Sequence, residues 1–293
     1  MSPLWADLGL VYCAAVWGAT FYMVKDALAG VDPVAMVCHR FLLSALLLAP
    51  WALVRPSRGR HLKESLILSV LLFLLYTTQT IGLNYTSASN SGFITGLFVI
   101  FVPIFLLFFF RKSPTVVQWI SSALALLGLW MLTGGISSVN FGDVITLVAA
   151  ATYAGHLLAT DKYVRADADS VVLAFHQFWM TGAMALVFCF ATGRSLAVTG
   201  DQAAGTIAFL AVVPTLSAFF IQMWAQKVTL PIKVSLIFSL EPVFGALFAW
   251  TLGGEAFVPA RAAGGGLIVA AMMAGELSKL DLLKGRRKEV LPT

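Results

Sequence analysis

The sequence predicts an all-α integral membrane protein with ten transmembrane helices, arranged as two inverted five-helix repeats. Three observations lead to this prediction: an apolar composition, a series of apolar runs long enough to cross a bilayer, and a match between the two halves of the chain. Of the 293 residues, 59% are hydrophobic and only 11% are charged. Soluble domains carry about 25% charged residues, so a soluble protein is excluded.

The apolar runs set the predicted elements. A membrane-spanning helix needs roughly 20 apolar residues, and these runs are too long for the alternating strands of a β-barrel. The first run lacks a basic leader and a small-residue cleavage site, so it is predicted to be a true span. The predicted spans are 4–26, 33–54, 63–84, 89–110, 115–134, 141–162, 170–192, 204–226, 231–252 and 260–278.

Lysine and arginine predict the orientation, because they concentrate in cytoplasmic loops. With the N-terminus inside, fifteen of them fall on the cytoplasmic side and three outside. We therefore expect both termini in the cytoplasm, and the net charge of +5 reflects topology rather than nucleic-acid binding. Arg40 is left within the membrane, where we expect a structural role: it either reaches the interface or bonds a backbone carbonyl or the unpaired end of a kinked helix.

The two halves of the chain match each other. LVYCAAVWGATFYMVK (10–25) aligns with LVAAATYAGHLLATDK (147–162), and YTTQT (76–80) with FFIQM (219–223). CHRFLLSALLL (38–48) aligns with FHQFWMTGAMAL (175–186). Five spans per repeat is an odd number, so the second repeat must be inverted. We expect a first repeat over 1–138, a second over 139–280 and a basic cytoplasmic tail over 281–293. Inverted repeats are typical of secondary transporters, whose substrate sites lie near the midplane.

The ninth predicted span carries the most costly residue. Glu241 lies at its middle, where a carboxylate costs about 3 kcal/mol even on lenient insertion scales. Its carboxylate either accepts a hydrogen bond from a neighbouring backbone group or pairs with a buried Arg or Lys, or it takes part in binding substrate or transferring protons. Pro242 follows it, and Pro103 occupies the matching place in the first half. Because proline removes a helical hydrogen bond, we expect both to act as hinges.

Depth in the spans sorts the remaining polar and aromatic residues. A substrate-binding site at mid-depth is predicted from Trp17, Phe98, Tyr153, Glu241 and Phe244. Two gates are predicted, His39 with Gln79 on the outer side and His176 with Gln222 on the inner side. The alternative is that the aromatic residues only pack the core and that the four gate residues hold helices together. Close helix packing is expected at Gly92, Gly96 and Gly264–Gly266.

Four stretches also resemble a known family. WGATFYMVK (17–25), HRF (39–41), GLNYTSAS (82–89) and SLEPVFGALFAWTLGGE (239–255) resemble the EamA-type branch of the drug/metabolite transporter superfamily. Within it, the chain looks most like the YddG-type amino-acid exporters of bacterial inner membranes. The resemblance implies efflux of aromatic and other apolar amino acids. Val102 stands where the second half has Glu241, so the buried acid belongs to one repeat alone.

The sequence predicts a secondary transporter that exports small metabolites, most favourably neutral and aromatic amino acids, with Glu241 holding the ammonium group. An exporter of drugs or other small metabolites is the first alternative. A membrane-embedded enzyme, a channel and a nucleotide-sugar antiporter are less favoured, since no catalytic or P-loop motif is present and only Arg40 offers a buried base. We expect no cofactor and no metal site, because the three cysteines lie inside apolar runs. The expected partners are a small-molecule substrate and the lipid bilayer, with no nucleic acid; a monomer is left open.

Overall fold

The computed structural model describes residues 3–135, 139–251 and 256–289, and its regular elements there are all helices. The nearest approach to a sheet in these ranges is an isolated bridge between Val31 and Val198. This confirms the all-α class. The predicted boundary between the repeats falls beside residues 136–138, which lie outside the described residues.

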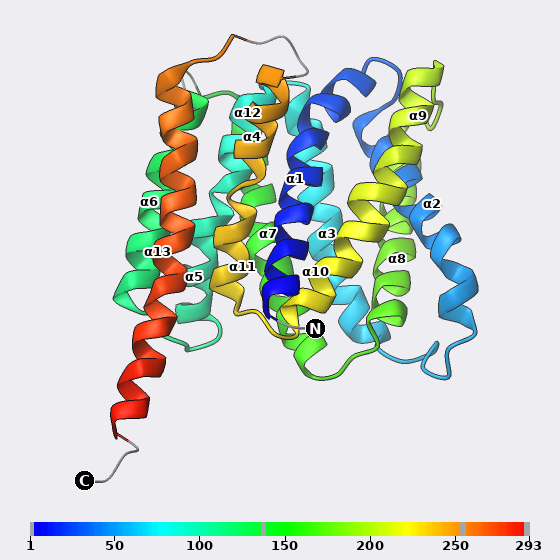
Figure 1. The fold of residues 1–293 in the computed structure, drawn as a ribbon. Coiled ribbons are helices and arrows are strands. Elements are labelled where there is room, and N and C mark those ends of the chain that lie inside the picture. The colour runs from blue at the N-terminus through cyan, green and yellow to red at the C-terminus, as the bar shows by residue number, and fades with distance from the viewer. Residues whose placement is uncertain (1–2, 136–138, 252–255, 290–293) are drawn as a thin grey trace.

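The first half of the chain contributes six helices to the bundle in Figure 1. They are α1 (Pro3–Ala27), α2 (Pro33–Leu53), α3 (Leu62–Leu83), α4 (Ala88–Gly96), α5 (Phe98–Phe108) and α6 (Val116–Thr133). The second half contributes α7 (Phe141–Arg165), α8 (Ser170–Thr192), α9 (Asp201–Leu210), the π-helix η1 (Ala211–Ser217), α10 (Ala218–Gln226), α11 (Pro231–Phe238), α12 (Glu241–Thr251) and α13 (Pro259–Glu289).

Nine helical stretches in the described part of the chain are long and apolar enough to cross a membrane. A further apolar helix, Pro259–Ala274, is shorter. The chain is thus a multi-pass membrane protein, while the tenth span stays a prediction. The helix α13 continues to Glu289, beyond the predicted span end at 278, because the basic segment is rich in strong helix formers. Its far end projects from the bundle on the side where the N-terminus also lies (Figure 1).

Local capping explains why several spans begin where the sequence predicted. Asp32 accepts a hydrogen bond from the Val34 N–H at 2.8 Å and starts α2 with Pro33 in its first turn. Thr115 and Gln118 form a capping box at α6, and Asn140 and Asp143 form another at α7. These side chains satisfy N–H groups that a helix start leaves free.

Three predicted spans are irregular. The fourth divides at Leu97, where α4 gives way to α5, and the ninth divides at Ser239 and Leu240, between α11 and α12. The eighth contains η1 around Pro214. The break in the fourth span lies more than a turn before Pro103, rather than at the proline, since the Leu97 N–H bonds the Ile94 carbonyl in a tightened turn. Discontinuous helices of this kind surround substrate sites in secondary transporters.

Glycines permit two close helix crossings. A Cβ on Gly18 would lie 2.3 Å from the Glu241 carbonyl oxygen, so α1 and α12 touch through backbone. Gly128 meets Gly264 between α6 and α13 in the same way. The expected close packing at Gly92 and Gly266 is wrong, because their helix faces meet nothing within 4 Å.

Candidate functional site

A cluster of aromatic rings fills the centre of the bundle. The Trp17 ring of α1 lies 4.9 Å from the Phe238 ring of α11 and 5.6 Å from the Phe219 ring of α10, edge to face in both cases. Tyr153 of α7 lies 4.4 Å from Phe98 of α5 and 6.3 Å from Trp17. Such tilted and edge-to-face pairs stabilise aromatic packing beyond area burial. Three of the predicted binding residues, Trp17, Phe98 and Tyr153, therefore meet.

Phe244 does not join these rings. It is half-buried on α12, where its ring stacks on Phe248 at 6.5 Å. Its Cβ lies against the Gly18 backbone position on α1. The structure therefore places Phe244 at the α1–α12 crossing, beside the cluster rather than in it.

Glu241 is buried, with 7% of its surface exposed, at the first position of α12. Its backbone carbonyl lies against Gly18 of α1, the residue that follows Trp17 of the aromatic cluster. The ion pairs among the described residues lie elsewhere: Arg165–Asp161, Arg194–Asp32 and Lys233–Asp7. Glu241 thus has no basic partner within the described part of the chain, which argues against the expectation that it serves a structural ion pair.

The π-helix η1 is fastened by side chains from α1 and α2. The Trp17 Nε1–H donates to the Pro214 carbonyl at 2.7 Å, and the Ser44 hydroxyl donates to the Ala211 carbonyl at 2.9 Å. Arg40 Nε donates to the Thr215 hydroxyl at 2.6 Å. A π-turn is wider than an α-turn and is frequent at functional sites. Pro214 explains the wide turn here, because it has no N–H to give to an α-helical partner.

Arg40 is only 4% exposed. Its guanidinium carbon lies 4.4 Å from the centre of the Tyr76 ring and 5.5 Å from that of Phe41, within the range of cation–π attraction. Nη2 also donates to the Tyr76 hydroxyl at 3.3 Å. The bonds of Arg40 go to side chains in the interior and not to the interface or to backbone carbonyls; of the expected roles, the nearest is the one at an irregular helix, because Thr215 belongs to η1.

A small cavity of about 10 Å³, roughly the space of one water, lies beside Arg40 between α1, α2 and α3. Its polar lining consists of Arg40, Tyr76, Gln79, Thr20 and Thr80, and apolar side chains such as Met36 and Leu83 complete it. It lies toward the ends of the three helices that are far from the N-terminus.

The four predicted gate residues form their hydrogen bonds with groups other than one another. His39 bonds the Leu196 carbonyl at 2.9 Å, and Gln79 donates to the Thr95 hydroxyl at 3.1 Å. His176 bonds the Arg58 carbonyl at 2.6 Å. Each histidine thus ties its helix to the loop that follows the other's helix: α2 to the α8–α9 loop, and α8 to the α2–α3 loop. Whether these residues gate access stays a prediction.

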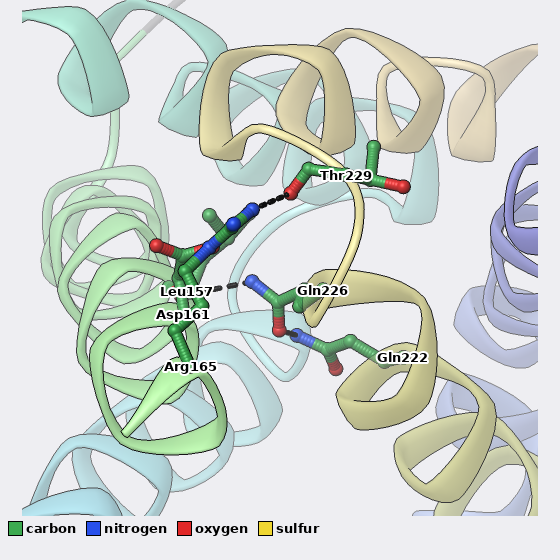
Figure 2. A network of polar contacts seen from close by, with 6 residues as sticks. All are labelled: Leu157, Asp161, Arg165, Gln222, Gln226 and Thr229. Atoms are coloured by element: carbon green, nitrogen blue, oxygen red, sulfur yellow. Dashed lines mark hydrogen bonds and ion pairs between the residues drawn. The ribbon is translucent and has the colours of Figure 1, made fainter. Parts of the chain in front are cut away.

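Gln222 belongs to a polar network where α7 and α10 end (Figure 2). It donates to Gln226 Oε1 at 3.1 Å, and Gln226 donates to the Leu157 carbonyl at 3.0 Å. Arg165 pairs with Asp161 at 2.8 Å and donates to the Thr229 carbonyl at 2.7 Å. The network holds the α10–α11 loop against α7 at the end of the bundle near the N-terminus.

The sequence-based prediction missed Tyr76, Phe219 and Phe238, which form much of the central cluster. Phe219 lies 5.7 Å from Phe178 and 6.4 Å from Tyr76, so it joins α10 to α8 and α3. A signal existed, because the same alignment that pairs Gln79 with Gln222 places Tyr76 opposite Phe219. It also missed the buried pair in which His156 bonds Gln177 Oε1 at 3.1 Å.

The profile of the EamA-like transporter family matches the chain twice, over residues 4–134 and 140–274. The chain belongs to the EamA-like transporter family. An uncharacterized transporter of Archaeoglobus fulgidus is 30% identical to it over 273 residues, which cover 93% of this chain and 86% of that protein. Its membership of this family and its similarity to an uncharacterized transporter sequence together identify the chain as a membrane transporter.

Further relatives of the transporter are more distant. The uncharacterized inner membrane transporter YedA of Escherichia coli is 24% identical over 295 residues, covering 95% of this chain and 92% of YedA. The uncharacterized transporter YdfC of Bacillus subtilis is 22% identical over 247 residues, covering 82% and 80%. A crystal structure superposes with a TM-score of 0.79 at 16% identity, over 94% of this chain and 98% of that one, so the two share a fold.

Proposed function

We propose that this transporter exports neutral amino acids with apolar or aromatic side chains across a bacterial inner membrane, by alternating access between two inverted repeats. The observation that carries the proposal is the buried carboxylate of Glu241, which has no basic partner among the described residues and lies beside the central aromatic cluster. A carboxylate offers an ammonium group a partner, and the aromatic rings suit an apolar side chain.

The same geometry predicts which net charge of the substrate the site prefers. A cationic amino acid would bring a second positive charge against the aromatic wall, and an acidic one would meet the charge of Glu241. Either would lose hydration without gaining a partner, which costs several kcal/mol. Neutral amino acids avoid both penalties, so they are the favoured class.

Three observations support the inverted repeats, and the distribution of lysine and arginine supports the orientation. The family profile matches twice, on either side of the expected boundary at 138–139. The equivalent residues Phe41 and Phe178 lie 5.9 Å apart, as residues beside a two-fold axis do. The reciprocal bonds of His39 and His176 to each other's loops have the same symmetry. With the N-terminus in the cytoplasm, the lysine and arginine bias is satisfied.

The substitution Glu241→Gln tests the proposal. In proteoliposomes we expect counterflow of phenylalanine and leucine to fall at least about tenfold, because an amide cannot form the ion pair with the ammonium. Glu64→Gln at the start of α3 is the matched control and should keep full activity. Full retention of transport in folded Glu241→Gln protein would remove the ammonium role and leave this acid a structural one.

A further inference from the structure

Arg40 is a buried cation with part of its hydrogen-bonding capacity unused. A guanidinium has five N–H groups. Nε donates to Thr215 and one N–H of Nη2 donates to Tyr76, whereas Nη1 donates to none of the described residues. Two N–H groups of Nη1 and one of Nη2 therefore remain, and one from each nitrogen suffices for the end-on fork with which arginine holds a carboxylate in two hydrogen bonds.

The surroundings fix this fork in place. The Tyr76 and Phe41 rings flank the guanidinium, and Thr215 on η1 holds its Nε. A rigid, pre-oriented guanidinium loses little entropy when a ligand binds. The same groups also offset part of the cost of burying the charge, which explains how it persists without an acidic partner.

Arg40 and Glu241 carry opposite charges and are both buried, yet they do not form an ion pair with each other. Two buried opposite charges held apart are costly for the empty protein. They suit a solute that carries both an anionic and a cationic group.

The cavity adjoins Arg40, which forms part of its lining. Besides Arg40 it is lined by Tyr76 and Gln79. Gln79 Nε2 uses one of its two N–H groups on Thr95 and has a second available for an anion. The remaining lining is mostly apolar, which strengthens electrostatic attraction by excluding water.

We propose that this cavity is the subsite for the carboxylate of the transported solute, held by the fork of Arg40 with help from Gln79. The inference rests on the proposed function for the identity of the solute. In the orientation given above, the cavity lies in the outer half of the bundle, so the carboxylate is bound there on the way out. The present cavity holds about one water, so binding of a carboxylate there requires α1, α2 and α3 to separate.

The test changes the ligand and the protein together. Binding of phenylalanine and phenylalaninamide to purified full-length protein is measured by calorimetry, along with the ammonium-free pair 3-phenylpropionate and 3-phenylpropanamide. The wild type should bind each carboxylate at least about tenfold more tightly than its amide, as charge-assisted hydrogen bonds imply. Arg40→Gln should weaken only the carboxylates and abolish the preference. Arg55→Gln, an exposed loop arginine, is the charge-matched control.

Two further variants cover the case in which Arg40→Gln does not fold. Tyr76→Phe keeps the ring and removes the hydroxyl, and Gln79→Leu removes the second donor; both should weaken carboxylates selectively and less strongly. Equal loss for carboxylates and amides in these variants, or a wild type without preference, would overturn the subsite. If amino acids are transported but Arg40 shows no such selectivity, the proposed function stands and the subsite falls. If no amino acid is transported but phenylpropionate binds through Arg40, the subsite stands and the substrate assignment falls.

Discussion

At the scale of single residues, the free-energy cost of burying a side chain identifies the site more reliably than the residue type does. Glu241 and Arg40 stand out in the sequence because a charge in an apolar span is expensive. The sequence cannot say whether two such charges pair, since pairing depends on how the helices rotate and cross. The structure shows both side chains buried, and neither belongs to an ion pair among the described residues, as a binding site requires and a structural bridge does not.

The aromatic residues also show that a sequence does not predict which way a side chain faces in the assembled bundle. Trp17, Phe98 and Tyr153 lie at mid-depth in their spans and meet at the centre, as depth alone predicted. Phe244 shares that depth, but its ring stacks on Phe248 of the same helix and does not join the cluster. Depth follows from position in a span, whereas the facing direction follows from packing that no single span encodes.

Gly18 gives a residue-scale prediction. Gly18→Ala places a Cβ 2.3 Å from the Glu241 carbonyl oxygen, so α1 and α12 must separate. We expect a loss of about 1–3 kcal/mol in stability, typical of overpacking, seen as a lower melting temperature in detergent. Gly266→Ala is the control, because nothing lies within 4 Å of that position. An unchanged melting temperature for Gly18→Ala would show that the crossing is looser than described.

At the scale of elements, proline predicted irregular spans but not the form of the irregularity. The fourth and ninth spans both carry a proline and both are broken. The break before Pro103 lies at Leu97, and the wide turn of η1 surrounds Pro214. Hydropathy predicts the length and burial of a span, but it does not predict where the helix changes register. The predicted span starts at 33 and 141 agree with the starts of α2 and α7, where Asp32 and Asn140 cap the first turn through local bonds.

The hinges are tested by Pro103→Ala and Pro242→Ala, singly and together. If the fourth and ninth spans bend at these prolines as access alternates, restoring the missing backbone N–H should slow counterflow by about tenfold, equivalent to about 1.4 kcal/mol on the barrier, without loss of insertion. Pro50→Ala, at an exposed site inside α2, is the control. Wild-type rates in both single variants and the double variant would remove these prolines from the mechanism.

At the scale of the whole molecule, the internal match in the sequence predicted more than any motif did. It placed His39 opposite His176 and Phe41 opposite Phe178, and the structure gives both pairs symmetric contacts. It could not predict the bonding partners, because these lie in loops whose course depends on the assembled bundle. The all-α membrane fold followed from composition and run length alone.

Alternating access makes a prediction about two positions in a variant without Cys13, Cys38 and Cys189. Cysteines at 79 and 222, introduced singly by Gln79→Cys and Gln222→Cys, should respond to substrate in opposite directions when labelled by a maleimide. Position 79 lines the cavity at the end of the bundle far from the N-terminus, and position 222 lies in the polar network at the opposite end (Figure 2). Parallel changes at both positions, or none, would indicate that the glutamines only hold helices together.

The most direct measurement of the central claim is counterflow of a panel of labelled amino acids in proteoliposomes holding the wild-type chain. The account predicts rates well above those of empty liposomes for phenylalanine, tryptophan and leucine. It predicts rates at least about tenfold lower for lysine, arginine, aspartate and glutamate, because each brings an unpaired charge into an apolar site. Faster counterflow of the charged amino acids than of the neutral ones, or none for any amino acid, would contradict the account.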